Sequence, residues 1–150
     1  MRKLSLQLFA VLFSVASFGQ QHNFWALTDE STVGKNFFAT SQRPPVYKIF
    51  QLSDAAFKLT LLQAPSEKLV SASHSSFIVS FPLPNGGVEQ FRIVDAPVMD
   101  QALAARYPGI NSYAGQGIED PSSTIRFDVS PQGMNAIILS AKRPTIYQYK

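Results

Sequence analysis

The sequence predicts an α+β fold: a mainly antiparallel sheet built from hairpins, with two short helices packed on one face. Two turn signals each separate a pair of apolar, alternating runs, as hairpins do. The first joins residues 76–83 to 88–94 through Pro-Asn-Gly-Gly, and the second joins 124–129 to 134–139 through Ser-Pro-Gln-Gly. Helical spacing of apolar residues appears between these runs. Strands joined by hairpins favour an antiparallel sheet over a wound parallel one.

Composition limits the size and class of the protein. The 150 residues are 45% hydrophobic and 12% aromatic, which is enough for one domain with a real core. The absence of Cys excludes disulfides, thiolate zinc sites and cysteine nucleophiles. The basic residues are scattered, whereas nucleic-acid binding needs a clustered basic surface. No nucleic-acid partner is therefore expected.

The first 19 residues have the pattern of a secretory signal peptide. Arg2 and Lys3 precede an apolar run over residues 4–18, and small residues lead up to a cleavage point between Gly19 and Gln20. The alternative is a membrane anchor, but the run is shorter than the ~20 residues that span a bilayer. We expect export by the general secretory route to the periplasm or outside the cell, with no stable membrane anchor after cleavage.

The first part of the exported chain is harder to assign. Residues 20–44 are polar and read as an irregular segment, and residues 45–150 as an α+β domain that is incomplete at its C-terminal end. The aromatic pair Phe24-Trp25 has two interpretations, a docking anchor for a partner or part of the core, and core packing is favoured. A strand is expected over 46–52.

Two helices and the remaining strands follow. The pattern predicts a helix over 54–63, although its Leu-Thr-Leu stretch also permits a strand, and a helix over 99–107 with Met99, Leu103, Ala104 and Ala105 facing inward. Asn85-Gly86 predicts a primed turn with positive φ at both central residues. A strand over 110–113 then precedes a loop over 114–121. A last strand over 145–149 predicts an unpaired edge and poor solubility of the chain alone.

No motif for catalysis is complete. The zinc-binding His-Glu-x-x-His pattern, a phosphate loop and a Gly-x-Ser-x-Gly elbow are all missing from the sequence. His74 reads as a solvated loop residue, and His22 lies beside the cleavage point. Glu119-Asp120 is a carboxylate pair that suits either acid–base work or a cation, but Asp-Pro favours a turn with solvated charges. A hydrolase built on this pair lacks a nucleophile.

Glycines lie just before this pair. The run Gly115-Gln116-Gly117 permits a close backbone approach, but no basic residue accompanies it, so it is weak evidence for a phosphate site. The run is part of a longer pattern, Pro-x-Ile-x-x-Tyr-x-Gly-x-Gly-Ile-x-Asp-Pro, over residues 108–121. Residues 91–99, residues 103–110 and the early Phe24-Trp25 accompany it. This set resembles the N-terminal pro-region of secreted, reprolysin-like zinc metalloproteases of Bacteroidetes-type bacteria.

The resemblance implies a propeptide-like role without catalysis in this chain. The catalytic domain of that family is absent from the 150 residues, so no zinc ligand is carried over. The implied partner is a metalloprotease catalytic domain, in cis or in trans, which would hold the zinc; no cofactor is expected in this chain. The chain would assist folding of that domain and mask its cleft, with Gly115, Gln116, Gly117, Glu119 and Asp120 as candidate contacts. The alternative is a free-standing exported α+β module that binds a peptide or glycan.

Overall fold

The computed structural model describes residues 24–29, 31, 48–142 and 147–149. The predicted cleavage point between Gly19 and Gln20, together with His22, lies outside these residues. The elements follow one another in this order: β1 (Trp25–Thr28), β2 (Ile49–Leu52), α1 (Asp54–Leu61), a 3₁₀ turn (Ala72–His74), β3 (Ile78–Pro82), β4 (Val88–Asp95), α2 (Gln101–Arg106), β5 (Asn111–Gly117), β6 (Thr124–Ser130), β7 (Gly133–Leu139) and β8 (Tyr147–Tyr149).

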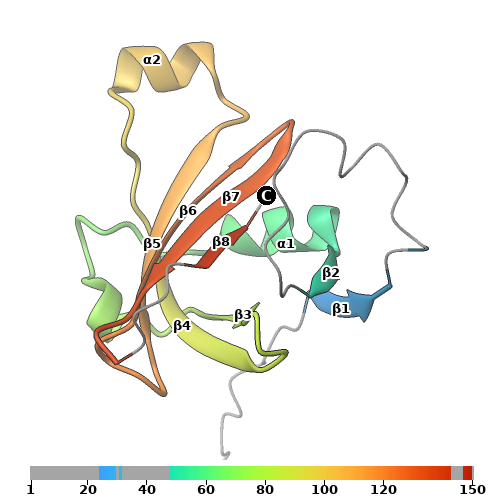
Figure 1. Ribbon diagram of the computed structural model, residues 1–150. Coiled ribbons are helices and arrows are strands. Elements are labelled where there is room, and N and C mark those ends of the chain that lie inside the picture. Colours follow the sequence, from blue (N-terminus) through green and yellow to red (C-terminus); the bar gives the residue numbers. More distant parts are fainter. Residues whose placement is uncertain (1–23, 30, 32–47, 143–146, 150) are drawn as a thin grey trace, which may run out of the picture.

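Strands β3 to β8 form one antiparallel sheet in chain order, and β1 pairs with β2 in a separate two-stranded sheet. The larger sheet curls around one side, and α1 lies across the mouth of the curl (Figure 1). Every pair of neighbouring strands is antiparallel. The predicted α+β class with a mainly antiparallel sheet is confirmed.

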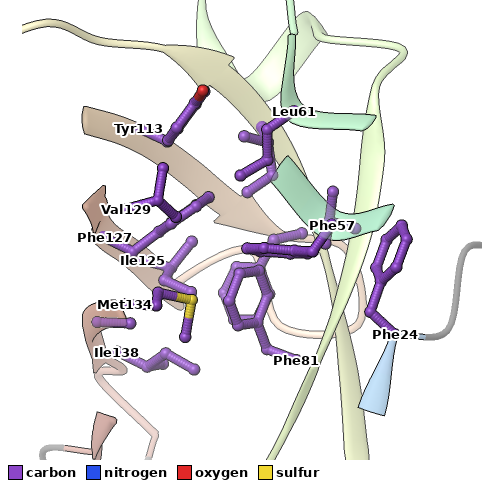
Figure 2. Close-up of a cluster of buried hydrophobic side chains, with 14 of the residues drawn as sticks. Phe24, Phe57, Leu61, Phe81, Tyr113, Ile125, Phe127, Val129, Met134 and Ile138 are labelled. Atoms are coloured by element: carbon purple, nitrogen blue, oxygen red, sulfur yellow. The ribbon is translucent and has the colours of Figure 1, made fainter. Parts of the chain in front are cut away.

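The core fills the inner face of the curl. Side chains alternate along each strand, so that one face of β6 buries Ile125, Phe127 and Val129 while the residues between them face outward. Helix α1 covers this face with Phe57 and Leu61, which are almost fully buried. The rings of Phe57 and Phe81 meet edge-on at the centre of the cluster (Figure 2). The predicted helix over 54–63 is therefore real and ends two residues early.

The sequence suggested that residues 20–44 are irregular, but part of this segment forms a strand. Trp25–Thr28 forms β1 in register with β2, and Phe24 is buried against Phe57. Trp25 is half-buried, packs against Phe57 and Phe81, and donates its indole N–H to the Ser80 carbonyl at 2.7 Å. The aromatic pair thus packs with the core beside α1, and the favoured interpretation of core packing is confirmed.

The second helix does not pack as expected. Helix α2 spans only Gln101–Arg106, contains no buried residue, and stands clear of the sheet (Figure 1). Leu103 is 39% exposed and Ala105 is exposed, while Met99 and Ala104 are only partly covered. The prediction that these side chains face inward was wrong, because residues 96–110 leave the sheet as an arm and α1 already fills its inner face.

The turn of the first hairpin also differs from the prediction. Gly86 has a φ of 88°, but no residue other than glycine has a positive φ in the described chain, so Asn85 does not adopt the primed conformation. The Gly86 N–H instead donates to the Leu83 carbonyl at 2.8 Å, and the Leu83 N–H donates to Gly87. Pro84 favours this arrangement, because its fixed φ suits the second position of an ordinary turn followed by a left-handed glycine.

Strand β5 is longer than the sequence indicated. The predicted loop over 114–121 is strand as far as Gly117, paired with β4 on one side and β6 on the other. Sequence reasoning took two glycines as loop signals, whereas both belong to β5: Gly115 is paired on both sides, and Gly117, the last residue of the strand, is paired with β4. The last strand is described over Tyr147–Tyr149, where it pairs with β7. The predicted strand over 46–52 is described from Ile49, and residues 46–47 lie outside the described chain.

Candidate functional site

The glycines of β5 allow neighbouring side chains and backbone to come unusually close. A Cβ at Gly115 would lie 2.5 Å from Cδ1 of Ile93 and 2.8 Å from Cγ2 of Ile125. A Cβ at Gly117 would lie 2.5 Å from the backbone oxygen of Asp120. All three distances are below van der Waals contact, so neither position accepts a larger residue without movement. These glycines are required by packing and do not form a phosphate loop.

Between them, Gln116 points to the other face of the sheet. Its side-chain Nε2 donates to the Pro121 carbonyl at 2.8 Å, which ties the end of β5 to the following turn. The turn is also held by the Gly117 N–H, which donates to the Ser123 carbonyl at 2.9 Å, and by the Ser123 N–H, which donates to the Asp120 carbonyl at 2.8 Å. Residues 117–123 therefore form a closed, well-bonded loop.

Asp120 is the centre of this loop and is only 6% exposed. One carboxylate oxygen accepts from the Ser122 hydroxyl at 2.7 Å and from the Ser122 N–H at 3.1 Å; the other accepts from the Ser140 hydroxyl at 2.7 Å. The ammonium of Lys142 lies 3.3 Å from the first oxygen. The hydrogen bonds from Ser140 and then Ser122 hold the pKa of Asp120 well below its usual range, because they stabilise the carboxylate.

Asp120 thus links the β5–β6 turn to the segment that follows β7. The expectation that this carboxylate is a solvated turn charge was wrong, because Ser140 and Lys142, which are distant in the sequence, enclose it. Glu119 has a different partner: its Oε2 accepts the backbone N–H of Gln90 on β4 at 2.9 Å. The two carboxylates are therefore engaged separately and do not act as a pair.

The remaining titratable candidates do not gather into a centre. His74 is exposed in the 3₁₀ turn, and its Nδ1 lies 2.8 Å from the Ser71 hydroxyl and 3.0 Å from the Ser73 hydroxyl, as a local turn contact. Within the described residues, no three His, Cys, Asp or Glu side chains come close enough to hold a metal ion. No helix in this part of the chain is long and apolar enough to cross a membrane.

A groove missed by sequence reasoning lies on the outer face, which we define as the face of the six-stranded sheet opposite the core. It has a volume of about 360 Å³. Its lining includes one residue of the 96–110 arm and five outer-face residues of β5, β6 and β7: Val98, Ser112, Arg126, Asp128, Asn135 and Ile137. The arm and the sheet thus form the two sides of one open hollow.

The sequence did carry a signal for this grouping. Arg126 and Asp128 alternate with buried residues of β6, so both must face outward. The two-residue connection at Pro131 and Gln132 fixes the register of the second hairpin, which places Asp128 opposite Asn135 and Arg126 opposite Ile137. The contribution of Val98 depends on the course of the arm, which local patterns did not predict.

Comparisons with known proteins add no assignment, since no family model, no curated protein and no solved structure matches this chain. The chain's own residues are therefore the basis for any functional proposal.

Proposed function

We propose that this chain is an exported, propeptide-like domain that assists the folding of a secreted zinc metalloprotease and masks its active-site cleft. The observation that carries the proposal is the 108–121 pattern, which resembles the pro-region of that family. Gly115 and Gly117 stand where a Cβ would clash, and Asp120 joins two turns of the sheet. The match is thus in residues that determine the fold, which supports a shared fold more strongly than a match in surface residues would.

The same contacts constrain how masking would work. Both oxygens of Asp120 accept hydrogen bonds from within the chain, so binding the zinc of a partner would require those bonds to break. Glu119 would likewise have to release the Gln90 N–H of β4. We therefore propose that the domain blocks the cleft sterically. Contacts within the chain engage the candidate residues, which would stabilise the blocking surface without binding the zinc: Gly115, Gln116, Gly117, Glu119 and Asp120. The zinc would belong to the partner.

A second candidate function is a free-standing exported module that binds a peptide or glycan. The groove on the outer face favours it, because open hollows with a few convergent polar groups are typical of binding sites. Of the 108–121 pattern, only Ser112 and Tyr113 are among the lining residues of the groove, so the two proposals rest on largely different residues.

The gene itself offers the first test. Sequencing the locus beyond codon 150, through the next reading frame, should reveal a continuous or neighbouring frame that encodes His-Glu-x-x-His and a third His downstream. A stop codon followed by an unrelated gene would contradict the proposal of a pro-region severed from its own protease, and would favour the binding module.

A further inference from the structure

Arg126 is the cationic side chain among the lining residues of the outer-face groove, and its charge has no protein partner within the described residues. It is exposed on β6, and in the part of the chain that the structure describes its guanidinium has no hydrogen bond or ion pair. Its register neighbours are Ala114 on β5 and Ile137 on β7, neither of which carries a charge. Five N–H donors are therefore directed to solvent beside an apolar wall.

Asp128, the acidic side chain among the lining residues, forms no ion pair with Arg126 in the part of the chain that the structure describes. Asp128 lies two residues further along β6, about 7 Å away at the usual rise of a strand. Its carboxylate accepts the Asn135 side-chain N–H at 3.3 Å, across the β6–β7 pair. Asp128 and Asn135 thus bind each other, and Arg126 remains available for a ligand.

Apolar side chains flank this cation. Val98 is 74% exposed on the arm, and Ile137 is 38% exposed on β7. The arm over residues 96–110 is a long connection between β4 and β5, because neighbouring antiparallel strands need only about two to five connecting residues. Its exposed apolar side chains, of which Leu103 and Tyr107 are two more, add nothing to the core. Long connections of this kind are often binding elements.

We propose that the outer-face groove binds an extended peptide that carries a carboxylate. The carboxylate would pair with the Arg126 guanidinium, whose fork geometry matches it. A neighbouring aliphatic side chain of the peptide would pack between Val98 and Ile137. Three strands about 4.8 Å apart span roughly 10 Å, so the groove holds three or four peptide residues. This inference does not depend on the protease proposal.

Charge complementarity favours an acidic peptide over a neutral glycan. A neutral sugar would leave the guanidinium without a counter-charge. The aromatic residues of the lining, Tyr113 and Phe127, are each only 4% exposed, so they offer no open ring face on which a sugar could stack. A peptide supplies both the carboxylate and the aliphatic side chain that these residues fit.

The test compares two fluorescein-labelled pentapeptides, Gly-Ile-Glu-Ile-Gly and Gly-Ile-Gln-Ile-Gly, by fluorescence anisotropy with the processed chain. We expect the Glu peptide to bind roughly tenfold more tightly than the Gln peptide, because a charge-assisted bidentate pair is replaced by a neutral contact. Arg126→Gln should remove this preference. Arg106→Gln, which removes an exposed cation of α2 outside the groove, is the matched control and should keep it. Circular dichroism verifies that both variants fold.

Backbone amide shifts in an NMR titration with the Glu peptide locate the site. Movement at Ser112, Arg126, Asn135 and Ile137 is the expected result. Equal affinity for the two peptides, loss of the preference in Arg106→Gln, or no binding of either peptide would each overturn the proposal. Shifts in the groove on titration with a neutral oligosaccharide but not with the Glu peptide would assign the groove to glycans.

Discussion

Replacing Gly115 by Ala tests whether close packing, and not loop flexibility, explains the glycines of β5. The new Cβ would lie 2.5 Å from Cδ1 of Ile93, 2.8 Å from Cγ2 of Ile125 and 3.0 Å from the Arg92 carbonyl oxygen. The two isoleucine methyls can move, but both are in the fully buried core and the carbonyl belongs to a paired strand. An overpacked core methyl typically costs about 1–3 kcal/mol.

An opposing effect reduces this cost. Alanine has fewer accessible conformations in the unfolded chain, which favours folding by about 0.4–1 kcal/mol. The net expectation is a loss of about 1–2 kcal/mol in the free energy of unfolding, or roughly 4–7 °C in the melting temperature of a domain of this size. Urea titration followed by circular dichroism measures the change directly, with an unchanged slope showing that the unfolded state is unaffected.

Gly109→Ala is the matched control. Its Cβ would meet only the ring of Pro131, at 3.1 Å, in an exposed loop that can adjust. A change within about 0.5 kcal/mol is expected there, as at most surface positions. If Gly115→Ala proves as stable as the unmodified chain, β5 does not pack between Ile93 and Ile125 as described, and the structural role of the 108–121 pattern is refuted.

Three further predictions concern single side chains. Phe57→Ala should cost about 3–5 kcal/mol because it empties the centre of the core, whereas Leu59→Ala on the exposed side of α1 should cost little; thermal melts distinguish them. Asp120→Asn should lower stability at pH 7, because the hydrogen bonds that lower the pKa of Asp120 stabilise its carboxylate in the folded state. This contribution is lost as the pH falls below about 4, the usual pKa of a carboxyl in the unfolded chain, so the difference between variant and unmodified chain should shrink there. A constant difference in urea titrations from pH 7 to 2 would argue against this. Burial, with a smaller effect of Asp95, raises the pKa of Tyr113 to about 12. Because the unfolded chain loses this proton near pH 10, the free energy of unfolding should fall between pH 10 and 12 by on the order of 1–2 kcal/mol after allowance for solvent screening. Tyr113→Phe should reduce that decline in alkaline urea titrations.

Local patterns predicted most of the fold and little of the site. Both hairpins and α1 were predictable, because alternation, turn residues and helical spacing act over a few positions. Core packing of Phe24 was favoured over a docking role and is confirmed, but local patterns left both open, since its burial depends on a sheet that begins more than fifty residues later. The arm carrying α2 was misjudged for a related reason: its apolar residues have helical spacing, but the inner face is already occupied by Phe57 and Leu61.

In the candidate site, too, features set by local patterns were predictable and features that depend on distant residues were not. Glycine at 115 was taken as a loop residue because its close neighbours, Ile93 and Ile125, lie on other strands, at least ten residues away in the sequence. Asp120 was taken as a solvated turn residue because Ser140 and Lys142 lie on a later turn. In contrast, the outward direction of Arg126 and Asp128 follows from alternation alone, and their neighbours follow from the register of one hairpin.

The propeptide proposal is tested most directly by protease inhibition. The purified, processed chain is titrated into the proteins secreted by the producing cells, and endopeptidase activity is followed with a quenched fluorescent substrate. A zinc chelator defines the metalloprotease fraction, and the chelator-resistant fraction is the internal control. We predict dose-dependent loss of the chelator-sensitive activity alone. Undiminished chelator-sensitive activity in the presence of excess folded chain would contradict the proposal.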